Sequence, residues 1–173
     1  TRTGHHFQDR ILVDIHRWTN RYWRNEEDTF PPRTAGKVVR WLEDNDSFRP
    51  WLLWVDFFDP HEPWDPPEYL VRKYDPDYDG TPMMHPNYGR AKDYTAAELR
   101  NLRAHYCAEA ELVDRWVGRI FQKLDDLALW DNSVVIFTTD HGMSLGEHER
   151  TGKSNINEGD DRRWPLYPEI AHI

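Results

Sequence analysis

The stretch SVVIFTTDHGMSLGEHERTGK, residues 133–153, joins a short apolar run to a dense group of polar side chains. The run SVVIF is bounded by turn residues, which is typical of a strand buried on both faces of a parallel sheet. It leads to Asp140 and His141, where Gly142 frees the backbone to turn. Ligands of open α/β sheets bind beyond the carboxyl ends of the strands. An acid and an imidazole there can both ligate a divalent cation, although Asp and Gly also end strands as a plain turn.

The residues before this stretch predict a β-α-β unit. WLLWVDFF, residues 51–58, is a second short apolar run and has the pattern of another buried strand. Thr95-Ala96-Ala97-Glu98 is a capping box, and apolar residues then recur every three or four positions to the region of Leu127. We therefore expect strands over 51–57 and 133–139 to be parallel members of one sheet, with a helix over 95–127 covering a face.

The rest of the chain is less regular. Residues 1–33 are polar and aromatic and indicate loop with one short helix, after which Thr34 is the expected N-cap of a helix that continues to Asn45. Residues 59–94 contain seven prolines, so we expect a long ordered loop without regular elements. A loop of this length in a compact domain is usually functional.

Composition narrows the class of protein. The chain has 173 residues, enough for one domain, and a net charge of −9, which argues against nucleic-acid binding. No apolar run approaches the length of a membrane span, and no signal peptide is present, which leaves the compartment open because the chain begins with Thr1. The single cysteine, Cys107, excludes an internal disulfide framework and is expected to be a small buried side chain of the long helix.

The motifs from Asp140 onward resemble the sulfatase family, within the alkaline-phosphatase-like superfamily. The chain has Asp-His-Gly at 140–142, Leu-Gly-Glu-His at 145–148 and Gly-Lys at 152–153, in the order and spacing of that family. The segment His61-Glu62-Pro63 resembles its His-x-Pro segment. The resemblance covers residues 34–173 and implies a single catalytic domain of three-layer αβα architecture with a mostly parallel sheet.

The resemblance also implies roles for individual residues. Asp140 and His141 become ligands of a divalent cation, which is usually calcium in sulfatases and manganese or zinc in related phosphonate and phosphate ester hydrolases. Lys153 becomes a clamp on the sulfate oxygens. His61 becomes a second sulfate contact or the acid that protonates the leaving alkoxide. Glu147 and His148 match the motif and are expected to support the loop.

The family's nucleophile, a formylglycine made in a Cys/Ser-x-Pro-x-Arg motif, has no match here. Cys107 lies in the wrong context. Thr29 to Arg33 fits the looser form Thr-x-Pro-x-Arg, but no strand with a terminal acid precedes it and it stands too close to His61. We therefore expect the nucleophile and further metal ligands to precede Thr1, both ends of the chain to be cut, and the isolated chain to be inactive.

Three functions remain open from the sequence. The first is a metal-dependent hydrolase of sulfuric esters that acts on a small-molecule or carbohydrate sulfate. The second is a phosphonate or phosphate ester hydrolase of the same superfamily. The third is a non-catalytic remnant that binds a metal or a partner without turnover. The nucleophile motif, which is expected upstream of Thr1, would distinguish in part between the first two functions.

Overall fold

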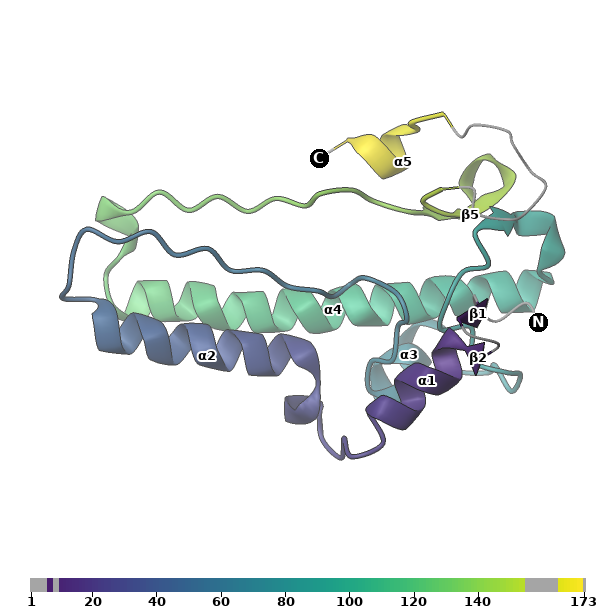
Figure 1. The fold of residues 1–173 in the computed structure, drawn as a ribbon, viewed down its shortest axis with the longest axis horizontal. Helices are drawn as coiled ribbons and strands as arrows, with labels where there is room; N and C mark the ends of the chain where they lie inside the picture. The colour runs from purple at the N-terminus through teal and green to yellow at the C-terminus, as the bar shows by residue number, and fades with distance from the viewer. Residues whose placement is uncertain (1–5, 8–9, 155–164, 173) are drawn as a thin grey trace.

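A computed structural model describes residues 6–7, 10–154 and 165–172 (Figure 1). The elements follow one another as β1 (His6–Phe7), β2 (Arg10–Ile11), α1 (Leu12–Thr19), η1 (Glu26–Asp28), α2 (Phe30–Asn45), α3 (Glu68–Tyr74), β3 (Gly89–Arg90), η2 (Ala91–Asp93), α4 (Ala96–Asp126), η3 (Trp130–Asn132), β4 (Ser144–Leu145), η4 (Glu147–Glu149), β5 (Arg150–Gly152) and α5 (Pro168–Ala171).

The long helix α4 is the axis of the molecule (Figure 1). Thr95 is its N-cap: the Thr95 side chain accepts from the Glu98 backbone N–H, and the Glu98 carboxylate accepts from the Thr95 N–H. Two helices pack on α4, with α3 placing Leu70 and Val71 against it and α2 packing nearer its C-terminal end. The predicted helix and its capping box are therefore confirmed. Cys107 lies in this helix but is only partly buried.

Helix α2 begins four residues before the predicted N-cap at Thr34. Pro31 and Pro32 lie inside its first turn and are buried there, and Thr29 stands at the N-cap position. Proline fits this place because the first N–H groups of a helix have no intrahelical acceptor. The expected N-cap at Thr34 was therefore wrong.

The expectation that residues 59–94 lack regular elements was wrong, because this loop contains helix α3, the short strand β3 and the 3₁₀ helix η2. Helix α3 occupies the seven residues between Pro67 and Asp75. The density of proline limits the length of this helix but not its existence, because Leu70 and Val71 are buried against α4.

The two runs predicted as strands are extended and run in the same direction along α4 (Figure 1), but neither forms a ladder. No backbone hydrogen bond joins residues 51–57 or 133–139 to another segment within the described part of the chain. Trp51, Leu53 and Val55 pack on the α2–α4 core, whereas the side chains between them face outward. The expectation of burial on both faces is not met within these residues, because a second layer and neighbouring strands are needed to cover them.

The hydrogen-bonded strands that the structure does describe are short and antiparallel. β1 pairs with β2, and a three-stranded sheet has the order β3-β5-β4. In this sheet Thr151 stands opposite Gly89 and Leu145. The sheet fixes the chain between the Asp-His-Gly turn and Lys153.

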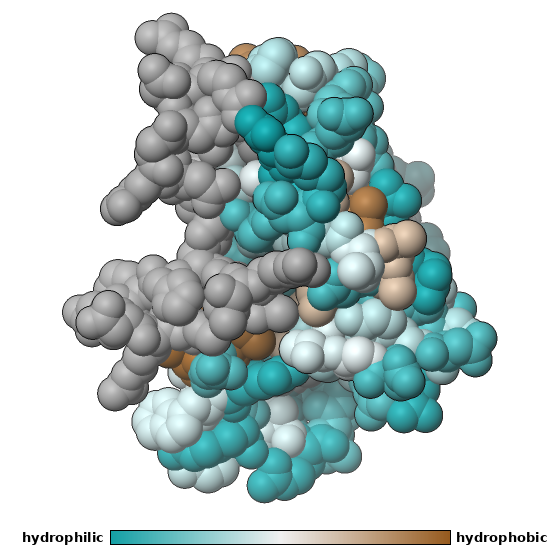
Figure 2. All heavy atoms as spheres, turned by 90° about the vertical axis from the view of Figure 1, so that its right-hand side faces the viewer, coloured by the Kyte–Doolittle hydropathy of each residue, from teal (hydrophilic) through white to brown (hydrophobic). Residues whose placement is uncertain are grey.

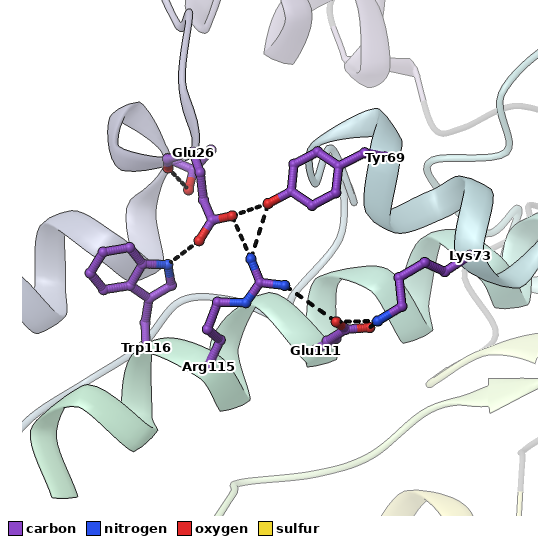
Figure 3. Close-up of polar contacts among 7 residues, drawn as sticks. Glu26, Tyr69, Lys73, Glu111, Arg115 and Trp116 are labelled. Atoms are coloured by element: carbon purple, nitrogen blue, oxygen red, sulfur yellow. Dashed lines mark hydrogen bonds and ion pairs between the residues drawn. The ribbon is translucent and has the colours of Figure 1, made fainter. Parts of the chain in front are cut away.

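A polar network ties the N-terminal part of the chain to α3 and α4 (Figure 3). The Glu26 carboxylate accepts from Trp116 Nε1 at 2.7 Å, from Arg115 Nη1 at 2.7 Å and from the Tyr69 hydroxyl. Arg115 also contacts Glu111, which in turn binds Lys73. One carboxylate therefore joins η1, α3 and α4.

The end of the molecule near β5 presents a mostly hydrophilic surface where its residues are described (Figure 2). Among the described helices, none is long and apolar enough to cross a membrane.

Candidate functional site

The segment that presents His61 is held down by Trp64. Trp64 is fully buried, its Nε1–H donates to the Pro60 carbonyl at 2.9 Å, and its backbone N–H donates to the Met84 carbonyl at 2.7 Å. The ring of His61 lies 4.6 Å from that of Phe58. The loop is therefore fixed on both sides of His61.

Lys153 is placed by the three-stranded sheet that ends at Gly152. Gly152 has a φ of +96°, and a Cβ there would lie 2.5 Å from the ring of Tyr88. Only glycine combines this backbone conformation with so close an approach. Thr151 is fully buried and its hydroxyl donates to Asn87 Oδ1 at 2.8 Å, which fixes the strand directly before the lysine.

His61 and Lys153 meet although 92 residues separate them. Lys153 Nζ lies 2.8 Å from His61 Nε2, and His61 Nδ1 lies 2.7 Å from the Glu62 carbonyl oxygen. An ammonium can only donate, and a carbonyl can only accept. In this geometry His61 is therefore neutral, with the proton on Nδ1, and Lys153 is the cation of the pair.

Glu62 completes the pair and has no role in the sequence analysis. Its Oε1 lies 3.6 Å from Lys153 Nζ and its Oε2 lies 3.5 Å from His61 Nδ1. Glu62 is only 4% exposed, and Oε2 is buried without a hydrogen-bond partner. The only signal in the sequence is an acid next to His61.

Asp140 and His141 occupy the turn after the extended segment. The Asp140 carboxylate accepts from the His141 backbone N–H at 2.9 Å and is 87% exposed through its side chain. The next residue, Gly142, donates its N–H to the Ile170 carbonyl at 2.8 Å. A Cβ at Gly142 would lie 2.1 Å from the Glu169 carbonyl oxygen, so the approach of residues 169–170 requires glycine.

The donor set of this turn fits a divalent cation in part. His141 Nδ1 lies 3.0 Å from the Gly142 carbonyl, so Nδ1 holds the proton and Nε2 keeps its lone pair. Asp140 Oδ2 lies 3.7 Å from His141 Nε2. Two ligands bound at about 2.0–2.2 Å to one cation are roughly 3–4 Å apart. The backbone therefore lets both side chains reach one point.

Two ligands do not make a complete coordination sphere. Within residues 6–7, 10–154 and 165–172, no group of three His, Cys, Asp or Glu side chains could hold a metal ion. Nor does any hydrogen bond or ion pair between described residues join the Asp140–His141 turn to the His61–Lys153 pair. The structure thus forms two separate pairs from the four residues expected in one site.

The other residues of the motif contact the loop itself. Glu147 accepts from the Leu145 backbone N–H at 2.5 Å. His148 stacks on Tyr167 with ring centroids 3.7 Å apart and contacts Glu169 at 3.1 Å. These contacts hold the segment that contains α5 against the loop. Thr29, the weak nucleophile candidate, is buried and donates to the Glu26 carbonyl.

Three titratable groups are buried beneath the His61 loop. Burial raises the pKa of Asp59 to about 7, and the nearby Asp65 adds to the rise. Burial raises the pKa of Glu109 to about 9, and Asp59 and Asp65 add to it. Burial lowers the pKa of His105 to about 4. The sequence analysis missed these groups because their burial depends on tertiary packing.

Comparison with known proteins relates the chain to ester hydrolases. The model of the Sulfatase family matches residues 7–166. An arylsulfatase of Clostridium perfringens is 26% identical over 166 residues, which cover 88% of this chain and 34% of that protein. Human iduronate 2-sulfatase is 29% identical over 155 residues, with 73% of this chain and 28% of that protein covered.

A solved structure shares the fold. The phosphonate monoester hydrolase of Agrobacterium radiobacter superimposes with a TM-score of 0.62 at 28% sequence identity, covering 79% of this chain and 32% of that one. This likeness confirms the expected alkaline-phosphatase-like α/β class. The chain spans about a third of the length of these relatives. It belongs to the sulfatase family.

Proposed function

We propose that the chain is part of a metal-dependent hydrolase that cleaves sulfate esters. The main supporting observation is the 2.8 Å contact between His61 and Lys153, two residues expected at the anion. The sulfatases among the relatives support the same chemistry. The proposed substrate is a small-molecule or carbohydrate sulfate, and the whole of residues 1–173 is proposed to belong to one catalytic domain.

Each residue of the pair has a distinct role in this proposal. Lys153 places a positive charge against the sulfate oxygens, where negative charge spreads during cleavage. His61 either donates a hydrogen bond to the sulfate or protonates the leaving alkoxide. Both roles need a proton on Nε2, the atom that accepts from Lys153 in this structure, so His61 must gain a proton there when the substrate binds.

Asp140 and His141 would hold the divalent cation, with further ligands and the formylglycine nucleophile supplied from outside residues 1–173. Calcium is proposed for a sulfatase, and manganese or zinc for the related hydrolases. A bound cation draws charge from the ester and stabilises the charge that develops during attack. The exposed Asp140 carboxylate and the His141 Nε2 that lies 3.7 Å from it support this assignment.

A phosphonate or phosphate ester hydrolase is the second candidate. The structural likeness to a phosphonate monoester hydrolase favours it. The two candidates share the fold and the same pairs of residues, so substrate preference must separate them. Steady-state rates on an aryl sulfate, an aryl phosphonate monoester and an aryl phosphate would rank the three chemistries.

The test uses the complete natural polypeptide that contains these residues. His61→Ala and Lys153→Ala should each lower kcat on an aryl sulfate by roughly 100-fold or more, with KM changing less, because both side chains act on charge that grows in the transition state. Lys123→Ala is a matched control, since Lys123 and Lys153 have equally exposed side chains (20%) and Lys123 pairs with Glu43 away from the site.

Unchanged rates in both site variants would refute the assignment of His61 and Lys153. Absence of turnover on all three esters by the complete polypeptide, with folding intact, would refute the enzyme and favour the non-catalytic remnant.

A further inference from the structure

Glu62 is a buried acid whose ion-pair contacts, among the described residues, are with the two residues of the proposed anion site. Its Oε1 lies 3.6 Å from Lys153 Nζ, and its Oε2 lies 3.5 Å from His61 Nδ1. The Nδ1 proton of His61 is already donated to the Glu62 backbone carbonyl. The carboxylate therefore lies near Lys153 and His61 but lacks a full set of hydrogen bonds, and its Oε2 has no hydrogen-bond partner.

A buried carboxylate of this kind acts mainly through its charge. An unpaired charge away from water is costly, so Glu62 and the Lys153 ammonium stabilise each other. His61 is neutral in this geometry and contributes no further charge. The three side chains together are therefore close to neutral before any substrate is present.

We propose that Glu62 is the counter-charge of the His61–Lys153 pair and biases this site toward singly charged ester groups. The inference rests on the proposed function in that the ester group is an anion held at Lys153. A sulfate monoester or a phosphonate monoester carries one negative charge, whereas a phosphate monoester carries close to two near neutral pH. Within the His61–Lys153 pair, where Glu62 already balances the one positive charge, the second charge of a phosphate is repelled by the Glu62 carboxylate.

Charge repulsion at this range is large enough to select substrates. Two like charges a few ångströms apart in a partly buried site interact strongly, even with a high effective dielectric constant. Removing the Glu62 charge should therefore improve the binding of a doubly charged ligand more than that of a singly charged one. We expect a relative shift of roughly tenfold.

The same carboxylate positions the pair. It attracts the ammonium of Lys153 from one side, so that the N–H groups on the other side point away from Glu62. In Glu62→Gln the shape is kept, but the charge that fixes Lys153 is lost. Turnover of a sulfate ester should fall although its KM does not rise, and a residue with only a packing role would not give this split.

The test measures binding of two ligands that have no ester bond to cleave. Benzenesulfonate is singly charged, and phenylphosphonate is doubly charged in mildly alkaline buffer; both place a tetrahedral head group on the same ring. Titration calorimetry of the complete polypeptide gives the ratio of their affinities. Glu62→Gln should shift this ratio roughly tenfold toward phenylphosphonate, whereas Glu62→Asp should keep the original ratio. Lys153→Ala should weaken both ligands.

Glu109→Gln is the matched control. Glu109 is also a buried glutamate with an Oε2 that lacks a partner, but burial raises its pKa to about 9, so its substitution alters a buried acid without removing a charge beside His61 and Lys153. Its substitution should leave the affinity ratio unchanged. If Glu62→Gln does not fold, Glu62→Ala removes the same charge with a smaller side chain and should shift the ratio in the same direction.

An unchanged ratio in folded, uncharged Glu62 variants would overturn the inference, as would a wild-type protein that binds neither ligand. The outcomes separate it from the proposed function. A shifted ratio without any ester turnover would retain the role of Glu62 and refute the hydrolase, whereas turnover with an unshifted ratio would do the reverse.

Discussion

Buried titratable side chains make the stability of this protein depend on pH. The pKa values of Asp59 and Glu109 are raised in the folded state, to about 7 and about 9, and that of His105 is lowered to about 4. Raised acid values mean that the folded protein holds protons that the unfolded chain releases, so stability falls as the pH rises toward those values. The lowered pKa of His105 acts in the opposite direction: the folded protein loses stability as the pH falls from about 6.5 toward about 4. Above neutral pH, Glu109 makes the largest contribution of the three to the change of stability with pH.

Glu109→Gln should flatten the loss of stability between about pH 7 and about pH 9. Unfolding of the wild-type protein releases the Glu109 proton in this range, whereas the amide has none to release. The free energy of unfolding from urea denaturation should therefore fall less in the variant, by roughly 1–2 kcal/mol. Glu68→Gln, on the exposed face of α3, should follow the wild type. Parallel curves for Glu109→Gln and the wild type would show that this acid is ionised throughout.

The residues of the site differ in how far sequence predicts them. His61, Asp140, His141 and Lys153 could be proposed because they stand in motifs whose order and spacing are specific. His61 and Lys153 come together because the β3-β5-β4 sheet positions the chain before Lys153. No local pattern of the sequence predicts this sheet. Glu62 could not be singled out, since an acid in a proline-rich loop is ordinarily exposed, and its burial is a result of tertiary packing.

At the scale of elements, the Glu26 network of Figure 3 is the main polar link between η1 and the helices α3 and α4. Glu26→Ala should lower the free energy of unfolding by roughly 1–3 kcal/mol, because Trp116 Nε1 and Arg115 lose an acceptor in a half-buried setting. Glu68→Ala breaks an exposed pair with Arg72 and should change stability by less than about 0.5 kcal/mol. Urea denaturation measures both, and equal effects would mean that the network is only a surface pairing.

The elements predicted best are those whose signals are local. Helix α4 has a capping box and a continuous apolar stripe, and both are read directly from the chain. The start of α2 was missed because residues 1–33 were interpreted as loop, although proline suits a first helical turn. Helix α3 was missed because the prolines of residues 59–94 were taken to exclude regular elements, although proline can flank a short helix. The pairing of strands far apart in the sequence is not local: residues 51–57 and 133–139 have the composition of strands, but a strand exists only with its neighbour.

The whole molecule presents apolar side chains where a compact domain would hide them. Leu52, Trp54, Val134 and Ile136 are each more than 80% exposed. We expect the isolated 173-residue chain to show no sulfatase turnover and to bind a hydrophobic dye strongly. The complete polypeptide should bind far less dye per molecule, since these faces would be covered. Turnover by the isolated chain would show that the catalytic groups all lie within it.

The open edges of these extended segments can pair in two ways, and the two pairings compete during folding. Completion of the sheet by the same polypeptide is a first-order event, whereas pairing with another copy is second order in protein. Exposed backbone edges flanked by apolar side chains accept either partner. Refolding yield should therefore depend steeply on concentration, and dilution or slow synthesis should favour the monomer over fibrous or amorphous precipitate.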